Sequence, residues 1–168
     1  MTQHTSRIAA QYARDSKDER PLLGYVGVLG AFSATAVAAA GLARLTGRTL
    51  PERLPAGDVA LLAIATHKLS RLLAKDAVTS PLRAPFTTYE GVSAPSELAE
   101  QVRGHGLQHS VGELLTCPMC LAQWVATGLC AGLVLAPTPT RLAMTTLTAV
   151  AGSDFLQHLY AALQQQSS

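Results

Sequence analysis

The sequence has few charged residues, few aromatic residues and few cysteines. Of its 168 residues, 14% are charged and 5% are aromatic, whereas 48% are hydrophobic. A soluble domain usually carries about 25% charged residues, so this deficit favours a membrane protein. The formal net charge of +2 is too small to indicate nucleic-acid binding. The three cysteines are too few for the disulfide framework of a small secreted domain.

Motifs that identify common enzymes are also missing from the sequence. It contains no G-x-S-x-G nucleophile elbow, no P-loop, no paired acidic metal motif and no glycine-rich nucleotide fingerprint. No internal repeat is evident. The sequence therefore does not support an enzymatic activity, and we expect no cofactor other than the zinc ion considered below.

Long apolar stretches are what the sequence does contain. No charged side chain occurs between Leu22 and Arg44, and about 20 apolar residues suffice to cross a bilayer core of about 30 Å. We expect an all-α fold, an integral membrane four-helix bundle over residues 21–163, between a polar tail at 1–20 and a short tail at 164–168. The expected helices lie at about 22–45, 57–78, 118–136 and 141–163, with a cytoplasmic loop at 79–117 between the second and third.

Basic residues give the expected orientation. The tail at 1–20, the end of the second helix and the loop at 79–117 together carry more Lys and Arg than the opposite connections. The positive-inside rule then places both termini and the long loop in the cytoplasm of a bacterial cell, with the helices in the inner membrane. Small residues on the helices, including the G-x-x-x-G of Gly128 and Gly132, predict close packing with another helix, in a homo-oligomer or with a membrane partner.

Polar side chains within the expected membrane helices are the first candidate site. The second helix carries His67, Lys68 and Arg71, and the fourth carries Asp154 and His158. A carboxylate in hydrocarbon needs a partner, so we expect Asp154 to pair with Lys68 or Arg71. The pair would serve either as a clasp that fixes the helix register or, because histidine titrates near neutral pH, as part of a proton or ion relay.

A Cys-Pro-Met-Cys step at the start of the third helix is the second candidate. Pro118 suits the first helical turn, which places Cys117 at the N-cap, with Cys120 about one turn later. Three interpretations are open: packing of the helix start, a zinc site completed by His105 and His109, or a thiol redox motif. In the reducing cytoplasm we expect no standing disulfide.

Around this step we expect a capping box at Ser110-Val-Gly-Glu113, a short helix over 96–102, and an extended course for the proline-rich segment before it. We also expect Arg83 and Glu113 to tie the long loop to Lys75 and Asp76 at the end of the second helix. Trp124 is expected near one membrane interface.

Three sequence blocks together resemble a known family. They are Lys68 to Asp76, then Val78-Thr with Arg83-Ala-Pro85-Phe86, then Glu113-Leu-Leu-Thr-Cys-Pro-Met-Cys-Leu-Ala-Gln-Trp124. In this order they resemble the small bacterial membrane-protein family numbered 1360 among domains of unknown function, which includes a sporulation protein. The resemblance covers roughly residues 57–158 and implies a membrane location, and it brings no reaction, ligand or catalytic residue.

The sequence thus predicts a structural or interaction protein of the bacterial inner membrane, with the lipid bilayer as its surroundings and no nucleic acid as partner. A small proton- or ion-coupled transport component that uses His67, Asp154 and His158 is the alternative. A zinc- or thiol-dependent redox factor is a third hypothesis.

Overall fold

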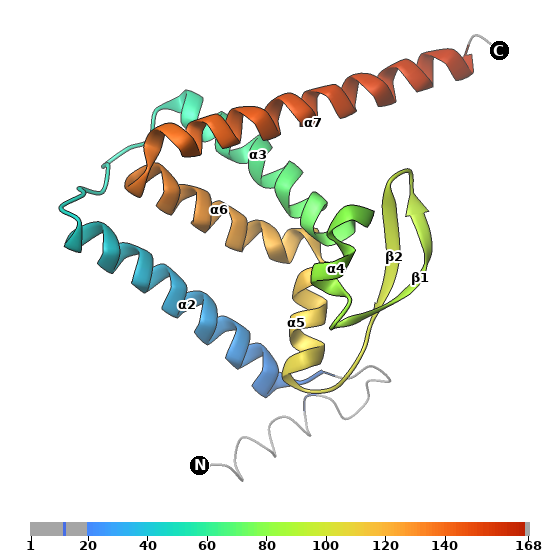
Figure 1. The fold of residues 1–168 in the computed structure, drawn as a ribbon, viewed down its shortest axis with the longest axis horizontal. Coiled ribbons are helices and arrows are strands. Elements are labelled where there is room, and N and C mark those ends of the chain that lie inside the picture. Colours follow the sequence, from blue (N-terminus) through green and yellow to red (C-terminus); the bar gives the residue numbers. More distant parts are fainter. Residues whose placement is uncertain (1–11, 13–19, 167–168) are drawn as a thin grey trace.

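The computed structural model describes residue 12 and residues 20–166, and most of these residues are helical (Figure 1). The long helices are α2 (Leu22–Leu45), α3 (Ala56–Lys75), α6 (Pro118–Leu135) and α7 (Pro137–Gln166). Between α3 and α6 lie the short elements η1 (Ala77–Thr79), α4 (Ser80–Arg83), β1 (Thr87–Ala94), β2 (Glu97–Val102) and α5 (Leu107–Thr116). The expected tail at 1–20 lies outside the described residues except for residues 12 and 20, and so do the last two residues of the tail expected at 164–168.

The long helices run back and forth between two ends of the molecule. In Figure 1, α2 and α6 run toward the connection at residues 46–55, and α3 and α7 run away from that end. The small core lies where α3, α6 and α7 meet, around Ala65, Leu133 and Met144. The hairpin of β1 and β2, together with α4 and α5, lies at the opposite end from residues 46–55.

Helix α2 touches the rest of the molecule mainly near its first turns. A Cβ added to Gly24 would lie 2.8 Å from the carbonyl oxygen of Gly106 and would also meet Ser110, so this glycine permits the close approach of α2 to α5. Further along, the rings of Phe32 and Trp124 meet edge to face with centroids 5.2 Å apart, which joins α2 to α6. Most other large side chains of α2 are exposed.

The segment between α3 and α6 differs most from the expectation. An antiparallel hairpin pairs Thr87 with Val102 and Ala94 with Glu97, and Ser96 adopts a positive φ of 66° in its turn. The expectation of a loop over 79–117 with a helix at 96–102 was therefore wrong, and the fold is mostly helical with a small sheet. Pairing with β1 satisfies the backbone of this short segment, which overrides its weak helical tendency.

The cap of α6 is confirmed, whereas the capping box before α5 is not. Cys117 is the N-cap, the backbone N–H of Cys120 donates to its Sγ at 3.2 Å, and Pro118 is the first helical residue. Helix α5 begins after Gly106, so Ser110 lies inside the helix and donates to the Gly106 carbonyl at 3.2 Å. The hydroxyl therefore does not cap the helix.

Other helix ends and packing faces also differ from the expectation. Helix α3 ends at Lys75, three residues before the expected boundary, and α7 begins at Pro137 and continues to Gln166. In α6, a Cβ on Gly132 would lie 2.6 Å from Thr140 Oγ1, but a Cβ on Gly128 would meet nothing within 4 Å. Gly132 thus packs on the start of α7, and the two glycines do not form one packing face within this chain.

In the described part of the chain, two helices, α2 and α6, are long and apolar enough to cross a membrane by length and composition. By length and composition, therefore, two of the four expected membrane helices are supported, and α3 and α7 do not meet the same criterion.

Candidate functional site

An open cavity of about 610 Å³ lies between α3, α7 and the turn of the hairpin. Its walls include all five polar residues that the sequence predicted within the membrane: His67, Lys68, Arg71, Asp154 and His158. The hairpin turn adds Pro95, Ser96 and Glu97, and α7 adds Ala151, Phe155, Gln157 and Ala161. Residues from three separate parts of the sequence therefore meet here.

Two ion pairs cross this cavity. Lys68 Nζ lies 2.8 Å from Asp154 Oδ2, which is one of the two pairings expected from the sequence. Arg71 does not share Asp154; its guanidinium donates to Glu97 Oε1, with Nε at 3.1 Å. The sequence reasoning missed Glu97, because a helix over 96–102 gave no reason to place this carboxylate against α3.

Charge in the cavity is balanced when both histidines are neutral. The two cations each have a carboxylate partner, and His67 and His158 are exposed on its walls. The polar lining can bind a polar ligand, and a charged ligand would have to compete with the existing ion pairs.

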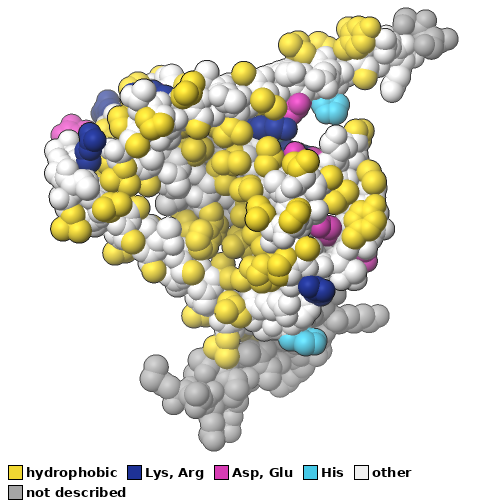
Figure 2. Space-filling model, in the orientation of Figure 1, with side chains coloured by type: hydrophobic (Ala, Val, Ile, Leu, Met, Phe, Trp, Pro, Cys, Tyr) yellow, Lys and Arg dark blue, Asp and Glu magenta, His cyan; other side chains and the backbone are white. Residues whose placement is uncertain are grey.

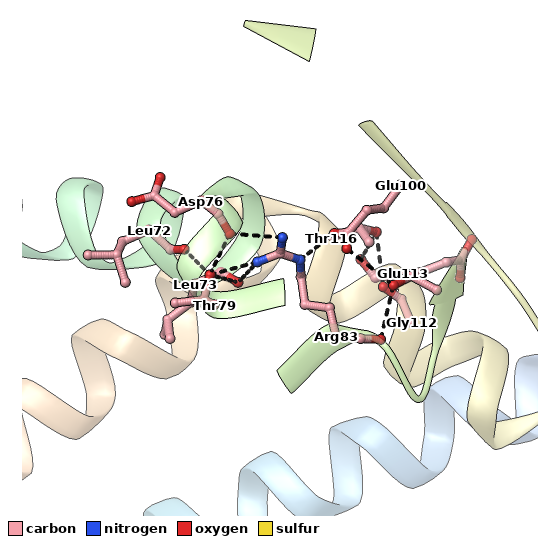
Figure 3. A network of polar contacts seen from close by, with 10 residues as sticks. Leu72, Leu73, Asp76, Thr79, Arg83, Glu100, Gly112, Glu113 and Thr116 are labelled. Atoms are coloured by element: carbon pink, nitrogen blue, oxygen red, sulfur yellow. Dashed lines mark hydrogen bonds and ion pairs between the residues drawn. The ribbon is translucent and has the colours of Figure 1, made fainter. Parts of the chain in front are cut away.

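The guanidinium of Arg83 is fully buried and contacts the end of α3 (Figure 3). It pairs with the Glu100 carboxylate of β2, and its Nη1 donates to the Leu73 carbonyl at 2.8 Å and to Thr79 Oγ1 at 2.7 Å. Nη2 donates to the Asp76 carbonyl at 3.0 Å. Arginine thus adds charged donors to carbonyl groups at the end of the helix and binds the hairpin to them.

Pro85 and Phe86, from the second of the three sequence blocks, have structural contacts of their own. The Pro85 carbonyl accepts from Gln108 Nε2 at 2.9 Å, and the Phe86 carbonyl accepts from the backbone N–H of Arg103 at 2.9 Å. These bonds hold the segment before the hairpin against the segment after it.

Glu113 lies elsewhere than expected. Its carboxylate accepts from the Tyr25 hydroxyl at 2.6 Å and from Arg20 Nη1 at 3.1 Å, so it binds the beginning of α2 rather than Lys75 or Asp76. Arg83 and Glu113 were expected to contact Lys75 and Asp76. Arg83 does contact Asp76, through the backbone carbonyl of Asp76.

The four residues proposed as zinc ligands do not gather into one group. Cys117 and Cys120 are joined in a disulfide, contrary to the expectation of free thiols. His109 Nε2 instead lies 3.6 Å from Glu113 Oε1. Within residue 12 and residues 20–166, no group of three or more His, Cys, Asp or Glu side chains is placed to hold a metal ion.

Comparisons with known proteins found one similar protein and one family model. The chain is similar to the sporulation protein YjcA of Bacillus subtilis (strain 168), with 32% identity over 71 residues. That alignment covers 40% of this chain and 60% of the relative's length. No solved structure matches the chain.

A family model described as "Protein of unknown function (DUF1360)" matches residues 61–160. The matched segment includes most of α3, the Arg83 network, the Cys117–Cys120 disulfide and the three polar residues of α7 that line the cavity. Because this match covers more than half of the chain, the protein belongs to the DUF1360 family, as the sequence resemblance predicted.

Proposed function

We propose that the protein is a multi-pass component of the bacterial inner membrane with a structural or interaction role. The exposed apolar surface of α2 is the observation that carries this proposal. Only 6% of its most apolar 18-residue stretch is buried within the molecule. Leu23, Val26 and Val37 are each more than 60% exposed. Such a continuous apolar surface is unfavourable in water and marks a membrane or protein contact.

The distribution of side chains supports the same proposal. Figure 2 shows hydrophobic side chains across the face formed by α2, α3 and α6, with charged side chains mostly toward its two ends. One end carries the Asp58–Arg141 ion pair beside the 46–55 connection. The other carries the cavity and the hairpin. An apolar belt between two polar ends fits a protein that crosses a bilayer.

In this proposal α3 and α7 cross the membrane beside α2 and α6. Their charged groups face each other, since Lys68 pairs with Asp154 and Asp58 pairs with Arg141. Paired charges within a bundle are far less unfavourable than charges facing lipid. The hairpin, α4 and α5 would then lie on the cytoplasmic side, where the basic residues are most numerous.

An interaction role follows from the surfaces that the single chain leaves uncovered. A Cβ added to Gly30 or Gly41 would meet nothing within 4 Å, so these small positions of α2 are open to another helix. We propose a second copy of the chain or another membrane protein as the partner. The name of the similar Bacillus protein suggests that this assembly acts during sporulation or a related developmental process.

Topology mapping tests the proposal directly. A variant with Cys117→Ser, Cys120→Ser and Cys130→Ala would carry one new cysteine, at Thr49 in the 46–55 connection or at Ser93 in β1. A membrane-impermeant maleimide should label Thr49→Cys in intact cells and Ser93→Cys only after the inner membrane is opened. Equal labelling of both sites, or release of the protein from membranes by alkaline carbonate, would contradict the proposal.

The polar cavity favours a second candidate, a small proton- or ion-coupled transport component. Two histidines and the Lys68–Asp154 pair share one open cavity, which provides titratable groups beside charges. Proteoliposomes that contain the protein and an internal pH dye should then show proton flux that Asp154→Asn and His67→Ala reduce. Gln157→Ala, on the same wall, is the matched control, and flux equal to that of empty liposomes would exclude this candidate.

A further inference from the structure

We propose that Cys117 and Cys120 form a thiol–disulfide exchange site that acts on a cysteine pair of a partner protein. The structure joins the two residues in a disulfide at the start of α6. Their Cα atoms lie 5.3 Å apart, a separation that disulfides commonly span. This activity goes beyond the membrane role proposed above and does not depend on it.

A stabilising role does not account for this bridge. The two cysteines are three residues apart in sequence, and the stabilisation that a disulfide gives grows with the length of chain it closes. The backbone between them is already the first turn of a helix that begins with Pro118, whose φ is fixed. A disulfide here therefore adds little constraint, which suits a bond that opens and closes.

The two sulfur atoms are not equivalent. Cys117 Sγ accepts the backbone N–H of Cys120 at 3.2 Å and sits at the N-terminus of the 18-residue helix α6. Backbone N–H groups and the helix dipole stabilise a thiolate at this position. Cys117 is therefore the attacking residue, and Cys120 is the residue that resolves the mixed disulfide.

A reactant can reach this pair. Both cysteines line an open pocket of about 480 Å³, whose walls are mainly apolar and include Val28 and Leu114. Cys120 is exposed, and the neighbouring Met119 is 87% exposed. These surroundings fit a protein segment in which apolar side chains flank the reacting cysteine.

In the reducing direction, the Cys117 thiolate attacks one sulfur of the partner's disulfide. A bond forms between Cys117 and that sulfur, and the partner's other sulfur leaves as a thiolate and takes a proton. The Cys120 thiolate then attacks Cys117, which closes the observed disulfide and releases the partner's second thiol. Two electrons and two protons pass to the partner, and cellular monothiols of the glutathione class reduce the Cys117–Cys120 bond again.

This chemistry is consistent with a cytoplasmic site. Disulfides of cytosolic proteins are usually transient and serve catalysis or redox sensing. A Cys-x-x-Cys pair that cycles between both states meets that condition, whereas a permanent bridge would not. Cys130, inside α6, is a separate free thiol and has no part in the exchange.

The test uses the full chain, purified in detergent, with Cys130→Ser so that only the pair reacts. Glutathione disulfide is the probe, and mass spectrometry follows the glutathione adduct at pH 7. Cys117 in the Cys120→Ser variant should form the adduct roughly three- to tenfold faster than Cys120 in the Cys117→Ser variant. With both cysteines present, the adduct should resolve to the Cys117–Cys120 disulfide. Equal rates, or an adduct that persists, would overturn the proposal.

A second measurement separates exchange from a structural bridge. Serine is itself a good N-cap, so Cys117→Ser with Cys120→Ser should keep the helix start and the thermal stability of the reduced wild type. Oxidising the wild-type pair should raise the melting temperature only slightly, and a large rise would show a structural bridge instead. Alkaline extraction of membranes tests only the membrane proposal. Its outcome does not affect the result of the exchange experiment.

Discussion

Asp58 and Arg141 join the beginnings of α3 and α7, with Arg141 Nε 2.9 Å from Asp58 Oδ1 and Nη2 2.7 Å from Oδ2. Ten residues further along α3, Lys68 meets Asp154 of α7 with the charges reversed. The two pairs occur in the same order on both helices, so α3 and α7 are parallel neighbours. Sliding α7 by one turn would break both pairs, and we infer that together they fix the register of the two helices.

Reversing the charges of the second pair should show this coupling. Asp154→Lys places two cations together and should lower the free energy of unfolding by about 1 kcal/mol, a modest loss because the Asp154 side chain is 42% exposed. Adding Lys68→Asp should recover most of the loss. The melting temperature of the two single variants and the double variant in detergent measures the effect.

Gln157→Lys is the control for this cycle, because it adds a cation to the same cavity without removing a partner of Lys68. It should have a smaller effect than Asp154→Lys. Additive losses in the double variant would show that the pair does not contribute to register.

Arg83→Met should lower the free energy of unfolding far more than Asp154→Lys does. It leaves the Glu100 carboxylate, only 6% exposed, without its cation and removes the guanidinium donors from the Leu73 and Asp76 carbonyls. Breaking a buried pair in this way destabilises a protein by about 3–5 kcal/mol. Arg83→Lys should not restore stability, because one ammonium group cannot reproduce the planar fork of donors. Thermal unfolding or loss of folded protein on expression measures the effect.

Arg103→Met is the matched control. Its side chain is exposed, and its Nε donates to the Pro85 carbonyl at 3.3 Å. We expect a loss below about 1 kcal/mol, as for most surface changes. Similar losses for the two arginines would contradict the central role assigned to Arg83.

Local features were predictable from the sequence, and long-range features were less so. The run from Leu22 gave helix α2, and Pro118 gave the start of α6, because both depend on neighbouring residues alone. The pairing of Lys68 with Asp154 was one of two alternatives, since helical spacing places Lys68 and Arg71 on overlapping faces. The structure distinguishes them because Glu97 takes Arg71.

The hairpin explains why the ion pairs of Arg71 and Arg83 could not be predicted from the sequence. Glu97 and Glu100 reach α3 and Arg83 only when residues 97–102 form a strand, and that strand depends on pairing with β1. In isolation the same short segment is equally compatible with a helical turn. Missing the strand therefore also meant missing the acidic partners of two arginines.

The contact of Phe32 with Trp124 allows the docking of α2 on α6 to be measured. Trp124 is the one tryptophan of the chain, so its fluorescence reports this contact alone. Phe32→Leu should shift the emission and lower stability by about 0.5–1.5 kcal/mol through loss of the edge-to-face contact. Phe155→Leu, an exposed position on α7, should leave the emission unchanged. Emission that is insensitive to Phe32 would mean that α2 does not dock here.

Two glycines of α2 should respond in opposite directions to the same substitution. Gly24→Ala introduces a Cβ 2.8 Å from the Gly106 carbonyl oxygen, which forces α2 away from α5. Overpacking of this kind destabilises by about 1–3 kcal/mol. Gly30→Ala meets nothing within 4 Å and should stabilise the helix by up to about 1 kcal/mol, because alanine favours helix more than glycine does.

The sign of each change separates packing within one chain from packing between chains. If melting temperatures fall for Gly24→Ala and rise for Gly30→Ala, α2 packs on its own chain at Gly24, and its surface at Gly30 is free. If Gly30→Ala instead lowers the melting temperature and also dissociates an oligomer on size-exclusion chromatography, another helix packs against Gly30. That outcome would favour the assembly proposed for α2, because a lone chain leaves space for a methyl group at this position.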